Sequence, residues 1–322
     1  MRSPVRPLEP GISVVVPAFN SEQSLGELIE RLEPVLREST SEEESFEVLL
    51  VNDGSADETW RVIGELARRH PWIRGIDLMR NYGQHNALLC GLRAARYRVT
   101  VTMDDDLQHP PEELPKLLDR LGGDCDVVYG APITHPHGLL RNLLSLTTKI
   151  ALQKAMGAES ARNISAWRTL RTRLREGFDR YRGAFVSLDV LLTWTTSRFA
   201  VVRVQHDPRT VGRSNYTLSK LVTHALNMMT GFTTLPLRLA SWIGFLFTLF
   251  GLMTLFYVVG RYAIEGGSVP GFPFLACIIS IFSGATLFSL GIIGEYVARM
   301  HVRVMDRPAY MVRSTCVQNS DD

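Results

Sequence analysis

The sequence predicts an α/β fold, in which a doubly wound sheet domain is followed by amphipathic interface helices and a C-terminal two-helix transmembrane hairpin. Three observations support this fold class. Between residues 12 and 130, apolar runs of strand length alternate with helical patterns, as expected for a parallel sheet with crossover helices. Several of these runs end in short polar turns, as strands do at the ligand-binding edge of such sheets. Segments 239–260 and 266–294 contain no charged residue, and each is long enough to cross the ~30 Å hydrocarbon layer of a membrane.

The first half of the chain contains four predicted strand–helix units. The apolar strands lie within 12–20, 46–55, 72–83 and 99–103, and the helices lie within 24–36, 59–69, 84–95 and from Pro110 or Pro111 onward. Leucine and isoleucine recur at helical spacing in the first helix, where Ser24 and Glu27 have the spacing of a capping box. Proline in a first turn, followed by two glutamates, favours a helix start after the fourth strand.

Three aspartates follow the fourth strand directly and organise the predicted site. Asp104 and Asp106 are two residues apart, so both carboxylates can turn toward one point, where oxygen ligands suit Mg²⁺ or Mn²⁺. Taken alone, the motif is explained equally well as a solvated acidic loop that caps the next helix. A parallel sheet, however, brings its strand ends to one edge, here 17–22, 52–55, 81–84 and 104–108. A metal at that edge would bind a diphosphate and neutralise its departure.

The second half of the sheet domain has weaker patterns. Further strands are predicted at 125–130 and 199–208. An amphipathic helix over about 139–157 has leucines on one side and basic residues on the other, which fits either a membrane surface or an ordinary domain helix. Segment 162–182 holds seven arginines. A solvated helix face is the default interpretation of these arginines, and contact with anionic headgroups or a phosphate ligand is the alternative.

The two uncharged segments predict a transmembrane hairpin over 233–298, entered through an amphipathic helix over 216–232. Buried core helices are the alternative, but globular helices seldom lack charge on every side over this length. Four arginines follow the second span, whereas the link between the spans carries only Arg261. This bias predicts a multi-pass protein of the cell membrane, with the sheet domain and a tail over 299–322 in the cytoplasm and the lipid bilayer as a partner.

Composition argues against several function classes. A net charge of +2 is too small to indicate nucleic-acid binding. The four cysteines are scattered without a CxxC pair, which fits a reducing cytosol rather than a disulfide or zinc framework. No GxGxxG follows the first strand, so a dinucleotide-type site is not supported. Residues 1–10 lack the apolar core of a signal peptide, and we expect a flexible arm there.

Seven motifs, taken together and in order, resemble those of the membrane-bound polyprenyl-phosphate glycosyltransferases. These are inverting GT-A enzymes of glycosyltransferase family two, and they include the dolichyl-phosphate mannose synthases. The motifs are VVVPAFN, VNDGSADET, RNYGQHNALLCG, TMDDDLQHPPEELP, RTVGRSNYTLSKL, TTLPLR and GEYVARMHVRVMDRPAY. RNYGQH and TTLPLR are most similar to the bacterial undecaprenyl-phosphate aminoarabinose transferases. The resemblance implies a GT-A catalytic domain over 11–215.

The resemblance also implies a reaction and a set of site residues. A nucleotide sugar, expected to be UDP-linked, donates its sugar to a polyprenyl phosphate such as undecaprenyl phosphate, with inversion and with Mg²⁺ or Mn²⁺ as cofactor. The implied catalytic and metal residues are Asp104, Asp106 and Gln108; the nucleotide-sugar residues are Pro17, Phe19, Glu22, Asp53, Asp105, Arg209 and Ser214; the acceptor-phosphate residues are Arg141 and Ser145. Asp105 is expected to present its backbone to the donor or to face away. Family members form tetramers, so a homo-oligomer is implied too.

Five places depart from the usual motifs of the family. Soon after the strand at 127–130 the family often has an arginine, where this chain has APITHPHG, so that phosphate contact is missing or moved to His135 or His137. Ser21 occupies the usual acidic position with Glu22 one place later, Asn52 replaces the first aspartate of DDGS, no acid stands at 162–164, and Asn215 replaces a lysine. These departures motivate an alternative function, a non-catalytic membrane protein that binds nucleotide sugars or anchors another transferase. A processive polysaccharide synthase is a second alternative, but the sequence lacks its QxxRW-like motif and its additional spans.

Overall fold

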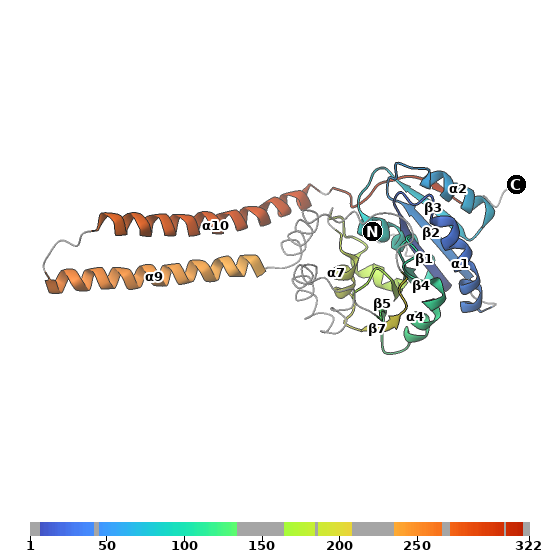
Figure 1. The fold of residues 1–322 in the computed structure, drawn as a ribbon, viewed down its shortest axis with the longest axis horizontal. Coiled ribbons are helices and arrows are strands. Elements are labelled where there is room, and N and C mark those ends of the chain that lie inside the picture. The colour runs from blue at the N-terminus through green and yellow to red at the C-terminus, as the bar shows by residue number, and fades with distance from the viewer. Residues whose placement is uncertain are drawn as a thin grey trace. The chain divides into compact units, whose positions relative to one another are not determined.

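A computed structural model describes residues 7–41, 45–133, 164–183, 186–207, 235–265, 271–305 and 307–317 (Figure 1). The chain forms two compact units. The first combines Met1–Leu218 with Asp306–Asp322, and the second is Ser219–Met305. In its described part the first unit is a mixed α/β fold, whereas the second consists of two long helices. The predicted fold class is therefore confirmed.

The first unit is built on an eight-stranded sheet with the strand order β7-β5-β6-β4-β1-β2-β3-β8. The strands are β1 (Glu9–Ala18), β2 (Ser45–Asn52), β3 (Ile73–Leu78), β4 (Tyr97–Thr102), β5 (Val127–Pro132), β6 (Arg168–Arg171), β7 (Phe199–Val204) and β8 (Val312–Cys316). Pairings among β1 to β4 and between β5 and β7 are parallel, whereas β6 and β8 run antiparallel to their neighbours. The predicted parallel core is present, and the two antiparallel strands extend it.

Helices cover both faces of this sheet (Figure 1). They are α1 (Leu25–Ser39), α2 (Thr59–Arg69), α3 (Gln84–Ala94), α4 (Leu114–Arg120) and α7 (Leu188–Thr193), with 3-10 segments η1 (Pro111–Glu113) and η2 (Thr172–Phe178). On one face α1 packs with α2 and α4, and on the other face α3 packs with α7 and η2. Ser24 precedes α1, but its side chain makes no capping hydrogen bond, so the predicted capping box is wrong.

Strand β1 lies near the centre of the sheet and is apolar on both faces. Val14 and Val16 belong to the core under α1, whereas Val15 packs against α3, and all three are fully buried. A strand covered on both faces is a continuous apolar run, which explains the VVV sequence. Gly91 permits the close approach of α3, because a Cβ at this position would lie 2.3 Å from Val15 Cγ1. The strand that leads into the site is thus held rigidly from both sides.

The arginine-rich segment is not a solvated helix face in its described part. Its described part forms β6, antiparallel between β4 and β5, and then the 3-10 segment η2. Arg168 is 2% exposed, and its Nη1 lies 3.2 Å from Asp189 Oδ1, which also accepts a hydrogen bond from the Tyr129 hydroxyl at 2.9 Å. Arg175 donates to three main-chain carbonyls at the C-terminal end of α3. These two arginines therefore stabilise the domain from within.

The chain that follows the second apolar helix returns to the sheet. This helix continues to Val304, past the start of the predicted tail at residue 299, whereas the candidate span within it ends at Ala298. Residues Val312–Cys316 then pair with β3 as the edge strand β8, which the sequence analysis did not predict. This pairing occupies one edge of the sheet, where unpaired N–H and C=O groups would otherwise be exposed.

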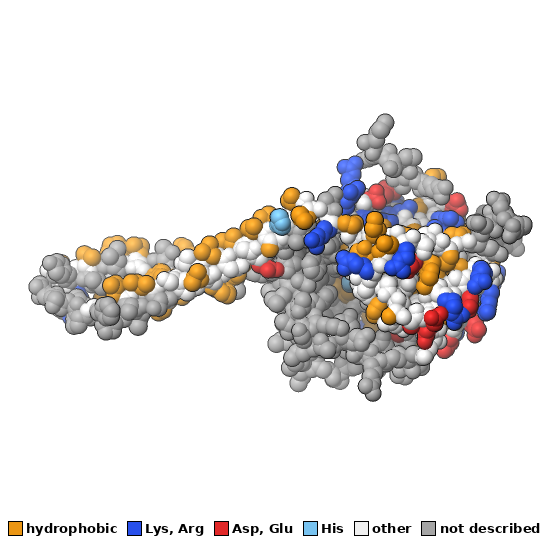
Figure 2. Space-filling model, turned by 90° about the horizontal axis from the view of Figure 1, so that it is seen from above, with side chains coloured by type: hydrophobic (Ala, Val, Ile, Leu, Met, Phe, Trp, Pro, Cys, Tyr) orange, Lys and Arg blue, Asp and Glu red, His pale blue; other side chains and the backbone are white. Residues whose placement is uncertain are grey.

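The described part of the second unit consists of α9 (Leu235–Glu265) and α10 (Phe272–Val304). At 1.5 Å per residue these helices are about 46 Å and 50 Å long, which exceeds the ~30 Å hydrocarbon layer. Ala240–Arg261 and Ile281–Ala298 are apolar enough to cross a membrane, and neither stretch is buried by other described residues. Figure 2 shows apolar side chains along the helical second unit and charged side chains on the sheet-containing unit. By length and composition, both helices fit the predicted hairpin.

We expect the substitution Arg168→Gln to destabilise the first unit by about 3–5 kcal/mol, because it leaves the buried carboxylate of Asp189 without its cation. The measurement is the thermal midpoint of the purified full chain in detergent. Arg37→Gln is the matched control, since it breaks an exposed pair with Glu33 on α1, for which only a small shift is expected. Equal shifts in the two variants would contradict the stabilising role of Arg168.

Candidate active site

The polar turns that end four neighbouring parallel strands meet at one edge of the sheet. In register, Ala18 of β1 lies beside Asn52 of β2, which lies beside Asp77 of β3, and Thr102 of β4 flanks Val15. The turns that follow these strands are joined by three hydrogen bonds from backbone N–H groups to side chains and by one hydrogen bond between side chains. The predicted convergence of strand ends is therefore present at the carboxyl edge, where open α/β sheets bind ligands.

Asp53 joins the turn after β2 to the turn after β3. Its Oδ1 accepts a hydrogen bond from Tyr82 N at 2.7 Å, and its Oδ2 accepts one from Gly83 N at 2.8 Å. Burial raises the pKa of Asp53, whereas these two N–H groups and the charge of Arg80 lower it. Gly83 has a φ of 97°, a backbone conformation that favours glycine. Asp53 thus shapes this turn, and its contact with a nucleotide remains a prediction.

Asp105 joins the turn after β4 to the turn after β1. Its Oδ2 accepts hydrogen bonds from the Ser21 hydroxyl and, at 3.3 Å, from Phe19 N. Burial raises the pKa of Asp105, and both hydrogen bonds act in the opposite direction. The carboxylate of Asp105 thus closes the β1 turn, and the expectation that Asp105 presents its backbone to the donor or faces away from it remains a prediction. Ser21, which departs from the usual family motif, donates one of these hydrogen bonds to the Asp105 carboxylate.

The flanking aspartates lie on the same turn as Gln108. Gln84, the first residue of α3, donates from Nε2 to Asp104 Oδ1. Asp106 Oδ1 accepts a hydrogen bond from Gln108 N at 3.2 Å, and Leu107 between them has a φ of 59°. This left-handed conformation is uncommon for a residue other than glycine. Asp104, Asp106 and Gln108 are each half-buried at the sheet edge.

The residue types of this turn fit a hard divalent cation. Asp104, Asp106 and Gln108 provide two carboxylates and an amide oxygen, and no cluster of three His, Cys, Asp or Glu able to hold a metal occurs among the described residues. Magnesium typically binds one or two carboxylates together with substrate phosphates and water. Zinc prefers thiolate and imidazole ligands in a closed set. The residues therefore fit Mg²⁺ or Mn²⁺ bound with a phosphate ligand.

A second segment, at the end of β7, packs on this turn. Asp207 N donates to the Gln108 carbonyl at 3.1 Å. The ring of His109 lies 5.3 Å from those of both His206 and Trp167, measured between centroids. Burial lowers the pKa of His109 to about 3, with contributions from His206 and Arg168, so the imidazole is neutral at neutral pH. Nothing local in the sequence signals this contact.

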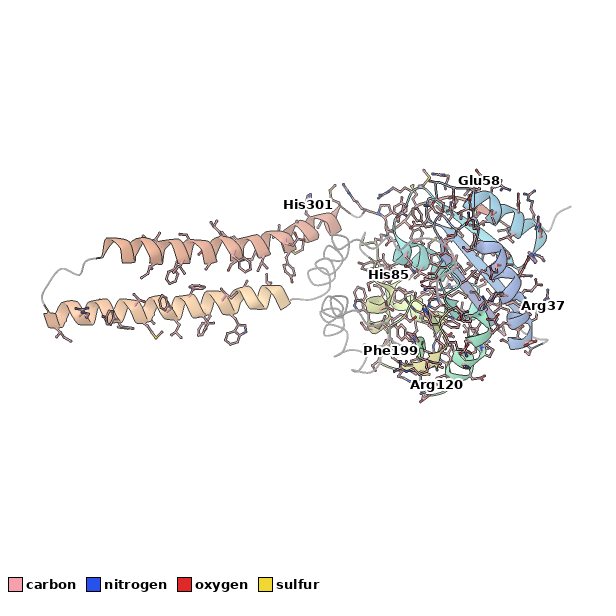
Figure 3. The ribbon with its side chains drawn as sticks, viewed as in Figure 1. Arg37, Glu58, His85, Arg120, Phe199 and His301 are labelled. Atoms are coloured by element: carbon pink, nitrogen blue, oxygen red, sulfur yellow. The ribbon has the colours of Figure 1, made fainter. Side chains whose placement is uncertain are left out.

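The remaining described residues of the predicted nucleotide site differ in their surroundings. Pro17 is buried within β1 beside Val51. The side chain of Phe19 is 43% exposed at the edge of the site, so its ring is accessible to a ligand. Glu22 turns toward α2, where its Oε2 accepts a hydrogen bond from Glu58 N at 2.9 Å; Figure 3 shows Glu58 at the start of that helix. Glu22 therefore caps α2 in this structure.

Four predicted site residues lie outside the described residues: Arg141, Ser145, Arg209 and Ser214. The predicted helices over 139–157 and 216–232 lie there too. The roles of these four residues and the presence of the two helices remain predictions.

Comparisons with known proteins identify the family. Residues 13–182 match the model of Glycosyl transferase family 2. The chain is 31% identical over 309 residues to an undecaprenyl-phosphate 4-deoxy-4-formamido-L-arabinose transferase of Pectobacterium carotovorum subsp. carotovorum (strain PC1), which covers 94% of this chain and 93% of the relative. It is 33% identical over 304 residues to the protein of the same name from Pseudomonas aeruginosa (strain LESB58), covering 94% and 89% respectively.

The fold is shared more widely. A crystal structure of glucosyl-3-phosphoglycerate synthase from Mycobacterium tuberculosis superposes with a TM-score of 0.50 at 20% identity, over 69% of this chain and 78% of that chain. This likeness supports the GT-A type of fold alone. The family match and the near full-length relatives confirm the resemblance in the motifs, and they favour an enzyme over the non-catalytic alternative. The chain belongs to glycosyltransferase family 2.

Proposed function

We propose that this glycosyltransferase moves a sugar from a nucleotide sugar, expected to be UDP-linked, to a polyprenyl phosphate such as undecaprenyl phosphate at the cytoplasmic face of the cell membrane. The observation that carries the proposal is the turn 104–108, whose oxygen ligands stand at the carboxyl edge of the sheet. Relatives named as undecaprenyl-phosphate transferases align over 94% of the chain and support polyprenyl-phosphate glycosyl transfer as the reaction class.

The donor is proposed to bind through its diphosphate at the carboxylate turn. Asp104, Asp106 and Gln108 would hold the divalent cation. When bound, the cation stabilises negative charge on the departing nucleoside diphosphate. The exposed ring of Phe19 offers a surface for the nucleotide base. Asp53 and Asp105 keep the surrounding turns in place, so that the donor meets a backbone that is already ordered.

The acceptor phosphate is proposed to supply the nucleophile. One of its oxygens attacks the anomeric carbon while the bond from that carbon to the diphosphate oxygen breaks, so the configuration inverts and a nucleoside diphosphate leaves. Because the phosphate is ionised at neutral pH, the reaction needs no strong general base and depends on positioning and charge stabilisation. Arg141 and Ser145 are proposed to hold the acceptor phosphate, and Arg209 and Ser214 to close over the donor.

The second unit suits a lipid acceptor. Helices α9 and α10 are long and apolar enough to insert into a bilayer, which would keep the enzyme at the surface where polyprenyl phosphates reside. The arginines that follow the second span favour a cytoplasmic position for the sheet-containing unit. We also propose that the protein forms a homo-oligomer, as the family resemblance implies.

The wild-type protein tests the reaction itself. Purified enzyme in detergent, with Mn²⁺, undecaprenyl phosphate and a panel of radiolabelled nucleotide sugars, is expected to form a lipid product that carries one sugar. Chromatography of the labelled lipid measures the product. A polymer of many sugars would instead support a processive synthase, and no labelled lipid with any donor would contradict the proposal.

We expect Asp106→Ala to lower kcat for sugar transfer about 10²-fold or more, because it removes one carboxylate from the proposed cation site. Steady-state transfer assays over a range of Mn²⁺ concentrations measure this loss. Asp119→Ala is the matched control, since Asp119 is an exposed carboxylate on α4. Transfer by the Asp106→Ala protein at the wild-type rate would overturn the cation assignment.

We expect Arg141→Ala to raise the KM for undecaprenyl phosphate about 10-fold and to leave the KM for the nucleotide sugar nearly unchanged. A charge-assisted hydrogen bond contributes about 1.5–3 kcal/mol, and 1.4 kcal/mol corresponds to a tenfold change. Varying each substrate at saturating levels of the other separates the two constants. Equal losses for both substrates would contradict an acceptor-binding role.

A further inference from the structure

The C-terminal segment, defined as residues 307–317, is tied to the first unit at several points. Strand β8 pairs with β3, with Asp77 beside Ser314. Met79 N donates to the Met311 carbonyl at 2.9 Å, and Asn86 Nδ2 donates to the Ala309 carbonyl. These contacts lie at the end of β3 and on α3. The segment therefore binds next to the turn that follows β3, which belongs to the candidate active site.

Arg313 of this segment faces a buried carboxylate. Asp77 is 2% exposed, and its Oδ2 lies 3.4 Å from Arg313 Nη1. Arg313 also donates from Nη2 to the Met79 carbonyl at 2.8 Å, which fixes the guanidinium against the end of β3. Burying an ionised carboxylate is costly unless a cation and hydrogen bonds compensate it. Arg313 supplies the positive charge, although its own side chain is 56% exposed.

Asn52 connects this carboxylate to the turn after β2. Its Nδ2 donates to Asp77 Oδ1 at 2.7 Å, and its Oδ1 accepts from Ser55 N at 3.2 Å and from the Ser55 hydroxyl at 2.6 Å. The amide thus donates on one side and accepts on the other. An aspartate at position 52 would set two buried carboxylates against each other, which would disfavour the ionised pair. Asn52 and Asp77 are therefore matched to each other.

Ser55 continues the connection into the turn after β1. Its hydroxyl accepts a hydrogen bond from Asn20 N at 3.0 Å, and Asn20 Oδ1 accepts one from Ala56 N at 2.9 Å. Asn20 has a φ of 55°, an uncommon conformation for a residue other than glycine. The turn after β2 also approaches the turn after β3 closely, since a Cβ on Gly54 would lie 2.5 Å from the Arg80 carbonyl carbon.

We propose that Arg313 is a positioning residue for the nucleotide-sugar site, acting through Asp77, Asn52 and Ser55 on the turns 18–22 and 52–57. The inference rests on the proposed function, because those turns are proposed to receive the donor. It assigns a role to the segment that directly follows α10 in the chain, and to the asparagine that replaces the usual first aspartate of the DDGS motif. Arg313 itself touches neither substrate.

The arrangement favours positioning over general stabilisation. The polar side chains of Arg313, Asp77, Asn52 and Ser55 each contact the next one in this order. The last of them accepts a hydrogen bond from a backbone N–H group in the turn after β1, so this series of contacts does not end in the apolar core. We expect Arg313→Gln to leave the sheet core folded, because β8 is an edge strand and the Arg313 side chain is 56% exposed, so that water can replace part of its interaction with Asp77, unlike at the buried Arg168. The expected defect is therefore in donor affinity, whereas acceptor binding should stay unchanged.

The test compares Arg313→Gln with Arg313→Lys and with Arg307→Gln, an exposed arginine of the same segment that serves as a matched control. Three quantities are measured on the full chain in detergent. They are the Kd for UDP in the presence of Mn²⁺, the KM for undecaprenyl phosphate, and hydrogen–deuterium exchange of peptides that cover 18–22 and 52–57.

For Arg313→Gln we expect a Kd for UDP about 10-fold higher, which corresponds to about 1.4 kcal/mol. Exchange in both turns should be faster, and the KM for undecaprenyl phosphate should be unchanged. Arg313→Lys should recover part of the affinity, and Arg307→Gln should match the wild type. Unchanged exchange in the two turns, or equal losses for UDP and for the acceptor, would overturn the inference. If wild-type protein binds no UDP while exchange still responds to Arg313→Gln, the proposed donor fails and the inferred connection stands.

An exchange of residues tests the match between positions 52 and 77. Asn52→Asp alone should weaken UDP binding, because it opposes the Asp77 carboxylate. The double variant Asn52→Asp, Asp77→Asn should recover binding, since the amide introduced at position 77 can donate to the carboxylate introduced at position 52 while its oxygen faces Arg313. A double variant that binds UDP no better than Asn52→Asp would contradict the pairing.

Discussion

A buried carboxylate needs donors, and this requirement shapes the candidate site. Asp53 and Asp105 lie at the ends of β2 and β4, and each is compensated by backbone N–H or hydroxyl groups from the turn after a neighbouring strand. The same groups that satisfy the charge also fix the backbone beside Asp104 and Asp106. The hydrogen bonds that compensate the desolvated carboxylates of Asp53 and Asp105 therefore also hold the turns in place, because a turn that moved would leave one of these carboxylates without its donors.

Local patterns were sufficient to predict the parallel half of the fold. Strands such as Val14–Val16 are apolar on both faces because helices cover both sides, and their length and polar endings follow from that burial. Parallel pairing then brings the ends of β1 to β4 to one edge, so the convergence of the four turns follows from topology alone. Asp104 and Asp106 follow from the acidic motif at the end of the fourth strand, whereas the role of Gln108 is implied by the family resemblance alone. The apolar character of α9 and α10 follows from their uncharged sequences.

What the sequence did not reveal depends on partners distant in the chain. An arginine is usually exposed to solvent, and the burial of Arg168 in β6 is favourable because Asp189 and Tyr129 lie beside it. Ser21 departs from the family motif in sequence, and only its contact with Asp105 shows what the serine does. Likewise, the contact of Asp207 with Gln108 joins residues about a hundred positions apart. Such pairs are set by the packed structure, and no local periodicity encodes them.

Strand β8 has a consequence for biosynthesis. Its residue Arg313 donates to the carbonyl of Met79 at the end of β3, and these two residues are 234 positions apart in the chain. At a synthesis rate of roughly 5–20 residues per second, the partner of β3 emerges about 12–50 s after β3 itself, and only after both apolar helices have been translated. Throughout that interval this edge of the sheet is open to other strands. Completion of the sheet therefore requires that translation has passed both apolar helices, α9 and α10.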